Sequence, residues 1–234
     1  MKCTAIILAA GQGKRMKTKV QKQFLMLQGK PLLYYSLACF QKSDEIQEIV
    51  VVTGKESIDY CRSEIIEKYG FTKVKSIAEG GKERYDSVYA GLEACSADTD
   101  YVFIHDGARP FVTEDIIKRT KEVAVTYQAC IAGMPSKDTV KIIDENNMVS
   151  ATPERSRVWS VQTPQVFLYS LIKEAHDTAR SVSMQGITDD AMVVEQYKNT
   201  PVHIVEGAYE NIKITTPEDI LVAGKIFEKI LISF

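Results

Sequence analysis

Short apolar runs rich in β-branched residues alternate along this chain with longer amphipathic segments. The runs predict strands at residues 4–9, 48–53, 73–77, 101–105 and 130–134. The segments between the last four predict helices at residues 55–68, 83–94 and 114–127. Because strand–helix–strand alternation builds right-handed crossovers, the sequence predicts an α/β fold with a mainly parallel sheet and helices on both faces. Ligands of such Rossmann-like folds bind where the strands end.

One segment interrupts the alternation. Residues 139–143 and 148–152 flank the polar stretch 144–147, which predicts a β-hairpin. A lone hairpin is only marginally stable, so we expect an arm, at about residues 136–158, that projects and contacts a second copy in a homodimer. A hairpin folded flat on its own domain is the alternative. Since no linker or repeat divides the chain, residues 1–234 are predicted to form a single domain.

Composition excludes several classes of partner. The net charge of −2 and pI of about 6.0 argue against binding to nucleic acid or to an anionic membrane surface. No apolar run approaches the roughly 20 residues needed to cross a bilayer, and the first predicted strand begins too early to leave room for a signal peptide. The five cysteines are isolated and form no Cys-x-x-Cys pair. We therefore expect a cytoplasmic protein with reduced thiols.

The loop after the first strand contains two glycines and several cations. Gly11 and Gly13 allow close approach of backbone to phosphate, and Lys14, Arg15 and Lys22 place positive charge beside it. The loop lacks the Gly-Lys-Ser/Thr ending of a P-loop and the third glycine of a dinucleotide fingerprint. It predicts binding of a nucleoside triphosphate; the alternative is a strand-to-helix turn with surface lysines.

Two further motifs follow predicted strands. Gly81 and Ser87, in Gly-Gly-Lys-Glu-Arg-Tyr-Asp-Ser-Val, are candidates for contacts to a base edge, or else belong to an ordinary strand-to-helix turn. Asp106 and Arg109, in His-Asp-Gly-Ala-Arg-Pro, are candidates to bind Mg²⁺ and a substrate phosphate. One carboxylate suffices for Mg²⁺ when phosphates supply the remaining ligands. The alternative is a surface Asp–Arg pair.

Residues from the second half of the chain complete the candidate site. Thr163 lies in the turn-like Gln-Thr-Pro-Gln, and Lys213 lies shortly before the last helix. Thr139 begins the hairpin and Arg155 follows it, with Arg157 as an alternative to Arg155. A solvated surface position is the alternative for each cation.

The Thr-Asp-Asp-Ala segment is interpreted as structural. Thr188 is predicted to cap a helix there. Asp189 and Asp190 are expected to point to different sides of that helix, which argues against a shared metal.

The sequence contains no Gly-x-Ser-x-Gly motif, no Cys/His nucleophile arrangement and no His-x-x-x-His metal pattern. An attacking phosphate monoester explains this absence, because it is largely a dianion at pH 7 and needs no general base. The protein then has to position two anions and offset charge at the reacting phosphorus.

Together these motifs closely resemble the 2-C-methyl-D-erythritol 4-phosphate cytidylyltransferases over the whole chain. The motifs that carry the resemblance occur in one order: Leu-Ala-Ala-Gly-x-Gly-x-Arg-Met, Lys-Gln-Phe, Gly-Gly-x-x-Arg-x-Asp-Ser-Val, His-Asp-Gly-Ala-Arg-Pro, Lys-Asp-Thr-Val-Lys, Gln-Thr-Pro-Gln, Thr-Asp-Asp-Ala and Glu-Asn-Ile-Lys-Ile-Thr-Thr-Pro-Glu-Asp. One departure is Gln21, where the family commonly has proline before the lysine.

The resemblance implies a nucleotidyltransferase domain that uses CTP, a polyol phosphate and Mg²⁺ and works as a homodimer. It implies roles for thirteen residues: catalysis for Arg15 and Lys22; nucleotide binding for Ala10, Gly11, Gly13, Gly81 and Ser87; metal and substrate binding for Asp106; substrate binding for Arg109, Thr163 and Lys213; and substrate binding from the partner's arm for Thr139 and Arg155. Two alternatives stay open: a cytidylyltransferase for ribitol 5-phosphate, and a non-catalytic nucleotide sensor.

Overall fold

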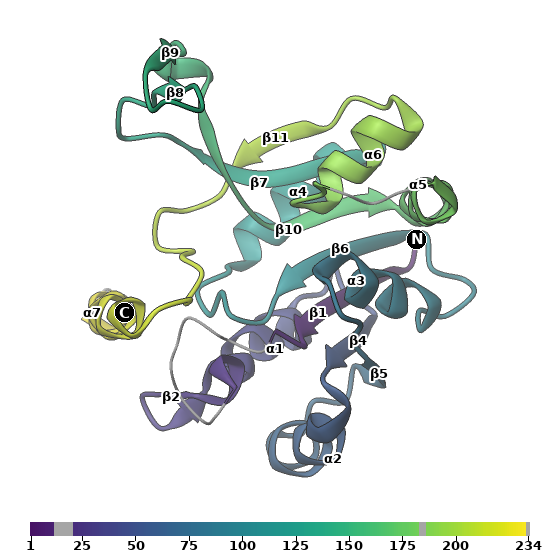
Figure 1. The fold of residues 1–234 in the computed structure, drawn as a ribbon. Helices are drawn as coiled ribbons and strands as arrows, with labels where there is room; N and C mark the ends of the chain where they lie inside the picture. Colours follow the sequence, from purple (N-terminus) through teal and green to yellow (C-terminus); the bar gives the residue numbers. More distant parts are fainter. Residues whose placement is uncertain (12–20, 183–185, 233–234) are drawn as a thin grey trace.

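The computed structural model describes residues 1–11, 21–182 and 186–232. Within these residues the main sheet has seven strands (Figure 1). In spatial order they are β11 (His203–Glu206), β7 (Ala129–Pro135), β10 (Trp159–Leu168), β6 (Tyr101–Asp106), β1 (Cys3–Ala9), β4 (Glu48–Thr53) and β5 (Val74–Glu79). Only β10 is antiparallel to its neighbours, β6 and β7, and the other neighbouring strands of the sheet are parallel. The predicted mainly parallel sheet is confirmed.

Helices cover both faces of this sheet. They are α1 (Leu32–Lys42), α2 (Ile58–Tyr60), α3 (Arg84–Glu93), α4 (Glu114–Tyr127), α5 (Tyr169–Val182) and α6 (Asp190–Lys198). A further helix, α7 (Pro217–Ile232), packs against α1, where Phe227 contacts Tyr35. The helix predicted at residues 55–68 is helical but irregular, since α2 lies between the 3₁₀ turn Lys55–Ser57 and the π-helical Cys61–Glu67.

The alternation of side chains along β1 explains the two layers. Ile7 packs in one apolar cluster with side chains of α1 and α4, whereas Ile6 packs in a second cluster with α3, α5 and α6. Both isoleucines are fully buried. Because both faces of the strand are covered, β1 is buried along almost all of its length and apolar except for Thr4, as expected for a central parallel strand.

The strand β10 was not predicted. Gln162–Gln165 was expected to form a turn, but these residues lie inside β10, between β6 and β7. The pairing of β10 with β7 shifts in register between Val161 and Gln165. This irregularity explains the turn-like sequence within a buried strand.

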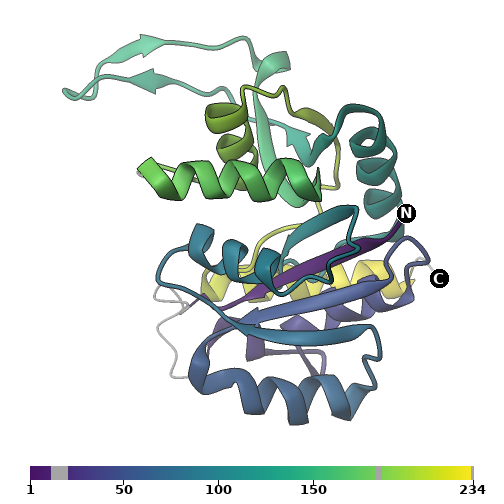
Figure 2. The same cartoon turned by 90° about the vertical axis from the view of Figure 1, so that its right-hand side faces the viewer.

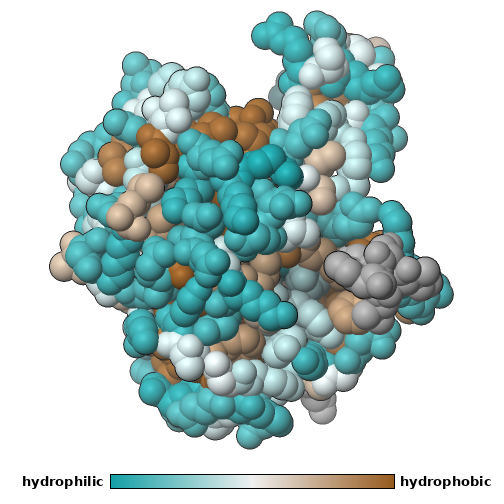
Figure 3. All heavy atoms as spheres, turned by 180° about the vertical axis from the view of Figure 1, so that it is seen from behind, coloured by the Kyte–Doolittle hydropathy of each residue, from teal (hydrophilic) through white to brown (hydrophobic). Residues whose placement is uncertain are grey.

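The predicted hairpin is present as β8 (Ile142–Ile143) paired antiparallel with β9 (Val149–Ala151). Figure 2 shows it extending away from the sheet, and in the space-filling view it stands out from the body at the upper right (Figure 3). Its apolar side chains are exposed, with Met148 at 67% and Val149 at 59%. We call residues 136–158 the arm.

Shorter elements complete the chain: the 3₁₀ turns Lys22–Phe24 and Arg155–Arg157, and the strand pair β2 (Met26–Leu27) and β3 (Lys30–Pro31). None of the helices in the described parts of the chain is long and apolar enough to cross a membrane.

Candidate active site

The candidate motifs meet at the carboxyl ends of the strands. Ala10 and Gly11 follow β1, Gly81 follows β5, and Asp106 is the last residue of β6. They line a cavity of about 550 Å³, which we call the first cavity. Its other lining residues are Leu8, Lys22, Gln23, Lys82, Glu83, Arg84, Ser87, Ala108 and Lys213.

A second cavity of about 660 Å³ adjoins the first. The two cavities share three charged residues, Arg84, Asp106 and Lys213. The second is also lined by Arg109, Ile131, Val161, Gln162, Thr163, Gln165, Thr188, Asp189, Ala191, Met192, Glu195 and Gln196. Arg84, Asp106 and Lys213 form a wall that the two cavities share, and a ligand group beside this wall is within reach of both cavities.

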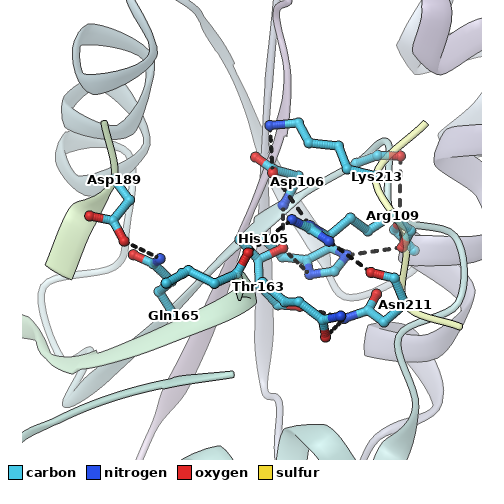
Figure 4. A network of polar contacts seen from close by, with 12 residues as sticks. His105, Asp106, Arg109, Thr163, Gln165, Asp189, Asn211 and Lys213 are labelled. Carbon is cyan, nitrogen blue, oxygen red and sulfur yellow. Dashed lines mark hydrogen bonds and ion pairs between the residues drawn. The ribbon is translucent and has the colours of Figure 1, made fainter. Parts of the chain in front are cut away.

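Asp106 lines both cavities, and Figure 4 shows its carboxylate facing Lys213. Its carboxylate lies 2.8 Å from Lys213 Nζ, 3.6 Å from Arg84 Nε and 3.7 Å from Arg109 Nε. Burial works to raise the pKa of this carboxyl, but the charges of Lys213, Arg84 and Arg109 together outweigh burial and hold the pKa well below its usual range. Asp106 is therefore ionised at any physiological pH.

Thr163, on β10, is fixed by hydrogen bonds to both sides. Its hydroxyl accepts from the backbone N–H of Asp106 at 3.1 Å and lies 3.0 Å from Nδ1 of the buried His105. The His105 Nε2 atom lies 3.2 Å from the carbonyl oxygen of Arg109. These contacts are all satisfied when Thr163 donates to Nδ1 and a neutral His105 donates from Nε2. Burial lowers the pKa of His105 to about 4, which agrees with a neutral ring.

Asn211 fixes the Arg109 side chain from the segment before α7. Its carbonyl oxygen accepts from Arg109 Nη1 at 2.7 Å, and its fully buried side chain donates from Nδ2 to the carbonyl of Thr163 at 2.9 Å. Lys213 follows two residues later. The contacts of Asn211 thus connect Arg109 to Thr163, although Asn211 was not among the predicted site residues.

Close backbone approach explains the glycines that precede α3. A Cβ at Gly80 would lie 2.3 Å from Ala10 Cβ, and one at Gly81 would lie 2.2 Å from Asp86 Cβ. Ser87 Oγ accepts from the Gly81 N–H at 3.2 Å. The hydroxyl of Ser87 therefore fixes the glycine segment to the first turn of α3.

The structure thus brings most predicted site residues together. Ala10, Gly11, Lys22, Gly81, Ser87, Asp106 and Lys213 line the first cavity, and Arg109 and Thr163 line the second. Gly13 and Arg15 lie outside the described residues. Thr139 and Arg155 are exposed on the arm and line neither of these cavities.

Arg84 lines both cavities but was not among the predicted site residues, and it pairs with Asp190. Arg84 Nη2 lies 2.8 Å from Asp190 Oδ2, which is almost fully buried. The predicted cap at Thr188 is wrong, because Asp189 caps α6 by accepting from the N–H of Met192. Asp189 and Asp190 do point apart, toward Gln165 and Arg84. The Arg84–Asp190 pair joins positions 106 residues apart, and nothing in the sequence signals that pairing.

The donor atoms present fit Mg²⁺ only if a substrate supplies most of its ligands. The described part of the chain contains no group of three or more His, Cys, Asp or Glu side chains that would hold a metal ion. Asp106 offers one carboxylate at the wall between the cavities. This matches a cation that keeps several waters and binds through phosphates.

Comparison with known proteins gives consistent matches. The family model described as IspD, 2-C-methyl-D-erythritol 4-phosphate cytidylyltransferase, matches residues 3–229. A protein of that name from Lachnoclostridium phytofermentans is 49% identical over 228 residues, covering 97% of each chain. The crystal structure of 4-diphosphocytidyl-2C-methyl-D-erythritol synthase from Anaerococcus prevotii is 35% identical, with a TM-score of 0.87 and coverage of 97% of this chain and 96% of that one. The 2-C-methyl-D-erythritol 4-phosphate cytidylyltransferase structure from Thermus thermophilus is 31% identical, with a TM-score of 0.79 over 97% and 98%.

Proposed function

The chain belongs to the 2-C-methyl-D-erythritol 4-phosphate cytidylyltransferase family, and we propose that it transfers the cytidylyl group of CTP to the phosphate of 2-C-methyl-D-erythritol 4-phosphate, releasing pyrophosphate. The products are CDP-methylerythritol and pyrophosphate, which places the enzyme in the non-mevalonate isoprenoid pathway. The main structural support is the pair of adjoining cavities that share Arg84, Asp106 and Lys213. A transfer between two anionic substrates needs such an arrangement.

The charges of the two cavities differ. Among the described residues, the first cavity is lined by four basic and two acidic side chains, a net charge of +2: Lys22, Lys82, Arg84 and Lys213 against Glu83 and Asp106. The second is lined by three of each, a net charge of zero: Arg84, Arg109 and Lys213 against Asp106, Asp189 and Glu195. The first cavity therefore suits a triphosphate, and we assign CTP to it and the polyol phosphate to the second.

The proposed reaction is an in-line displacement at phosphorus. A phosphate oxygen of methylerythritol phosphate forms a bond to the α-phosphorus of CTP, and the bond from that phosphorus to the bridging oxygen of pyrophosphate breaks. No general base is required, because the attacking phosphate is already largely a dianion at pH 7. Lys22 lines the first cavity and is assigned to neutralise charge that grows on the α-phosphate in the transition state. Arg15 is assigned the same role from its sequence motif.

Mg²⁺ is proposed to enter with CTP, with Asp106 as the one protein carboxylate beside it. When bound, the ion neutralises the triphosphate and makes pyrophosphate a better leaving group. The remaining tasks fall to the chain itself: Lys213 and Arg109 hold the carboxylate of Asp106, and the Thr163 hydroxyl, fixed by His105, is assigned to the polyol.

The arm is proposed to form the homodimer and to complete the second cavity of the partner. Its exposed apolar residues include Ile142, Ile143 and Met148, and a covering surface would remove them from water. The second cavity has no net positive charge of its own, although its proposed ligand is a phosphate dianion. Arg155 and Thr139, exposed on the arm, are assigned to supply these contacts from the other subunit.

We propose a cytoplasmic location because the cysteines are unpaired thiols. All five are free thiols, and burial raises the pKa of Cys39, Cys61, Cys95 and Cys130 to about 12. Unpaired, unreactive thiols of this kind are typical of a reducing compartment.

The test is pyrophosphate release with CTP and Mg²⁺, comparing methylerythritol 4-phosphate with ribitol 5-phosphate. Release with methylerythritol phosphate alone is expected. Faster release with ribitol 5-phosphate would make that compound the substrate in place of methylerythritol 4-phosphate. No pyrophosphate release with either polyol phosphate would favour a nucleotide sensor.

Mixed dimers test whether the arm of one subunit contributes to the site of the other. Arg155→Ala and Lys22→Ala chains are each expected to be nearly inactive, whereas mixed dimers should recover activity, because one of their two sites contains both native side chains. Failure of dissociated and reassociated mixtures to recover activity would contradict an arm that acts across the dimer.

A further inference from the structure

Arg84 occupies an unusual place between the two cavities. It is the first residue of α3 and lines both cavities. Its Nε lies 3.6 Å from Asp106 Oδ1 and its Nη2 lies 2.8 Å from Asp190 Oδ2, while 29% of the side chain stays exposed. Nη1 takes no part in these two contacts. The guanidinium therefore stands between two carboxylates with part of its surface open toward the cavities.

Asp190 is held in place from β10. The side-chain oxygen of Gln165 accepts from the backbone N–H groups of Asp190 and Ala191, at 3.0 and 3.1 Å. Gln165 Nε2 also donates to Asp189 Oδ2 at 2.9 Å. Because these bonds fix the first turn of α6 to the central sheet, the Asp190 carboxylate has a defined position opposite α3.

The Asp190 carboxylate is poorly suited to a purely stabilising role. It is 1% exposed, and its Oδ1 atom has no hydrogen-bond partner among the described residues. A buried ion pair is weak evidence for stability, since the desolvation of both charges offsets their attraction. The pair instead restricts the conformation of Arg84, a long side chain that otherwise has many rotamers.

We propose that Asp190 is a positioning residue that holds Arg84 in the wall between the cavities, where the guanidinium contacts the phosphate group transferred from one substrate to the other. This inference rests on the proposed function. It also assigns Arg84 as a substrate-contacting residue, with the α-phosphate of the nucleotide as its ligand. Without Asp190, Asp106 is the remaining carboxylate partner of Arg84, at 3.6 Å, and the guanidinium is free to leave the wall.

A double-mutant cycle tests the proposal. Asp190→Asn preserves shape and removes the charge, Arg84→Ala removes the guanidinium, and the double variant combines them. We expect Asp190→Asn to lower kcat/KM about 30-fold and Arg84→Ala by at least as much, with the double variant within about 3-fold of Arg84→Ala, because one residue acts through the other. Losses that multiply in the double variant would overturn the proposal.

Glu48→Gln is the matched control for a purely structural effect. Glu48 is also a buried carboxylate in an ion pair, 2.9 Å from Lys2 Nζ, but it begins β4 and so lies at the opposite end of the sheet from the cavities. We expect it to lower the Tm without changing kcat/KM by more than about 3-fold. If Asp190→Asn behaves in the same way, Asp190 is structural and the proposal is wrong.

Calorimetric binding of CTP, which carries the α-phosphate, in the presence of Mg²⁺ and without a polyol phosphate gives a readout that does not depend on turnover. The wild-type protein is expected to bind it, and Arg84→Ala and Asp190→Asn are each expected to weaken binding about 10-fold or more, with Glu48→Gln unchanged. This pattern in a protein that fails to turn over methylerythritol phosphate would refute the proposed function and support the Asp190–Arg84 pair as an anion-binding device. Equal binding by all four proteins, or none by the wild type, would refute the pair's role.

Discussion

The neutral His105 leads to a specific prediction about stability at acid pH. Burial lowers the pKa of His105 to about 4 in the folded protein, against about 6.5 in an unfolded chain. Protonation would turn Nδ1 into a donor that faces Thr163 Oγ1, 3.0 Å away, and this hydroxyl already accepts from the N–H of Asp106. The folded state therefore resists the proton that the unfolded state accepts.

The sign and size of the effect follow from linkage. Between the two pKa values the unfolded chain binds more protons, so the contribution of His105 is complete above about pH 6.5 and is lost as the pH falls toward 4. At about 1.4 kcal/mol per pH unit, acidification from pH 7 to pH 4.5 removes about 2 kcal/mol of unfolding free energy through this residue. Asp106, whose pKa is held below its usual range, acts in the same direction but below about pH 4.

The assay is urea unfolding of the wild-type protein and His105→Gln at pH 7 and at pH 4.5. Glutamine does not titrate, so the variant is expected to be less stable at pH 7 but to lose about 2 kcal/mol less on acidification. His176, whose pKa is also lowered by burial, is present in both proteins and cancels in the difference. Parallel loss of stability in the two proteins would refute a buried neutral His105.

Three further predictions concern the site itself. Lys22→Ala is expected to lower kcat about 1000-fold while CTP binding, measured by calorimetry, falls far less, since charge stabilisation is used mainly in the transition state; comparable losses in both would exclude that role. Thr163→Val leaves the Asp106 N–H and His105 Nδ1 without their shared partner and should cost about 2–4 kcal/mol in urea unfolding; an unchanged midpoint would contradict this. Chelation of Mg²⁺ should abolish pyrophosphate release but leave the Tm of the ligand-free protein unchanged, and a lowered Tm would indicate a structural metal instead.

The sequence predicted the fold well where elements follow simple periodicity. The alternation of apolar strands and amphipathic helices located β1, β4, β5, β6 and β7, and the motifs that follow β1, β5 and β6 do meet at one end of the sheet. Neighbouring parallel strands end at the same edge of the sheet, so motifs that follow these strands can be predicted to lie close together.

Prediction failed where long-range contacts decide the structure. Gln162–Gln165 resembles a turn because its pattern is broken by proline and by a shift in register, yet pairing with β6 and β7 makes it part of a buried strand. The sequence places Asp190 at the start of a helix but does not indicate the ion pair that it forms. Its partner Arg84 lies more than one hundred positions earlier, and only the packing of α3 against α5 and α6 reveals the pair.

The position of β10 in the sheet also has a consequence for the order of folding. β6 and β7 are consecutive strands of this sheet along the chain, but they are not neighbours in it, since β10 lies between them. During synthesis the chain reaches residue 135 with both strands complete, and the strand that must separate them begins only at Trp159. Until then β6 and β7 each present an unpaired edge. A chain whose synthesis pauses within the arm is thus prone to incorrect strand pairing and to aggregation. It leaves that state when β10 inserts as an antiparallel strand between β6 and β7.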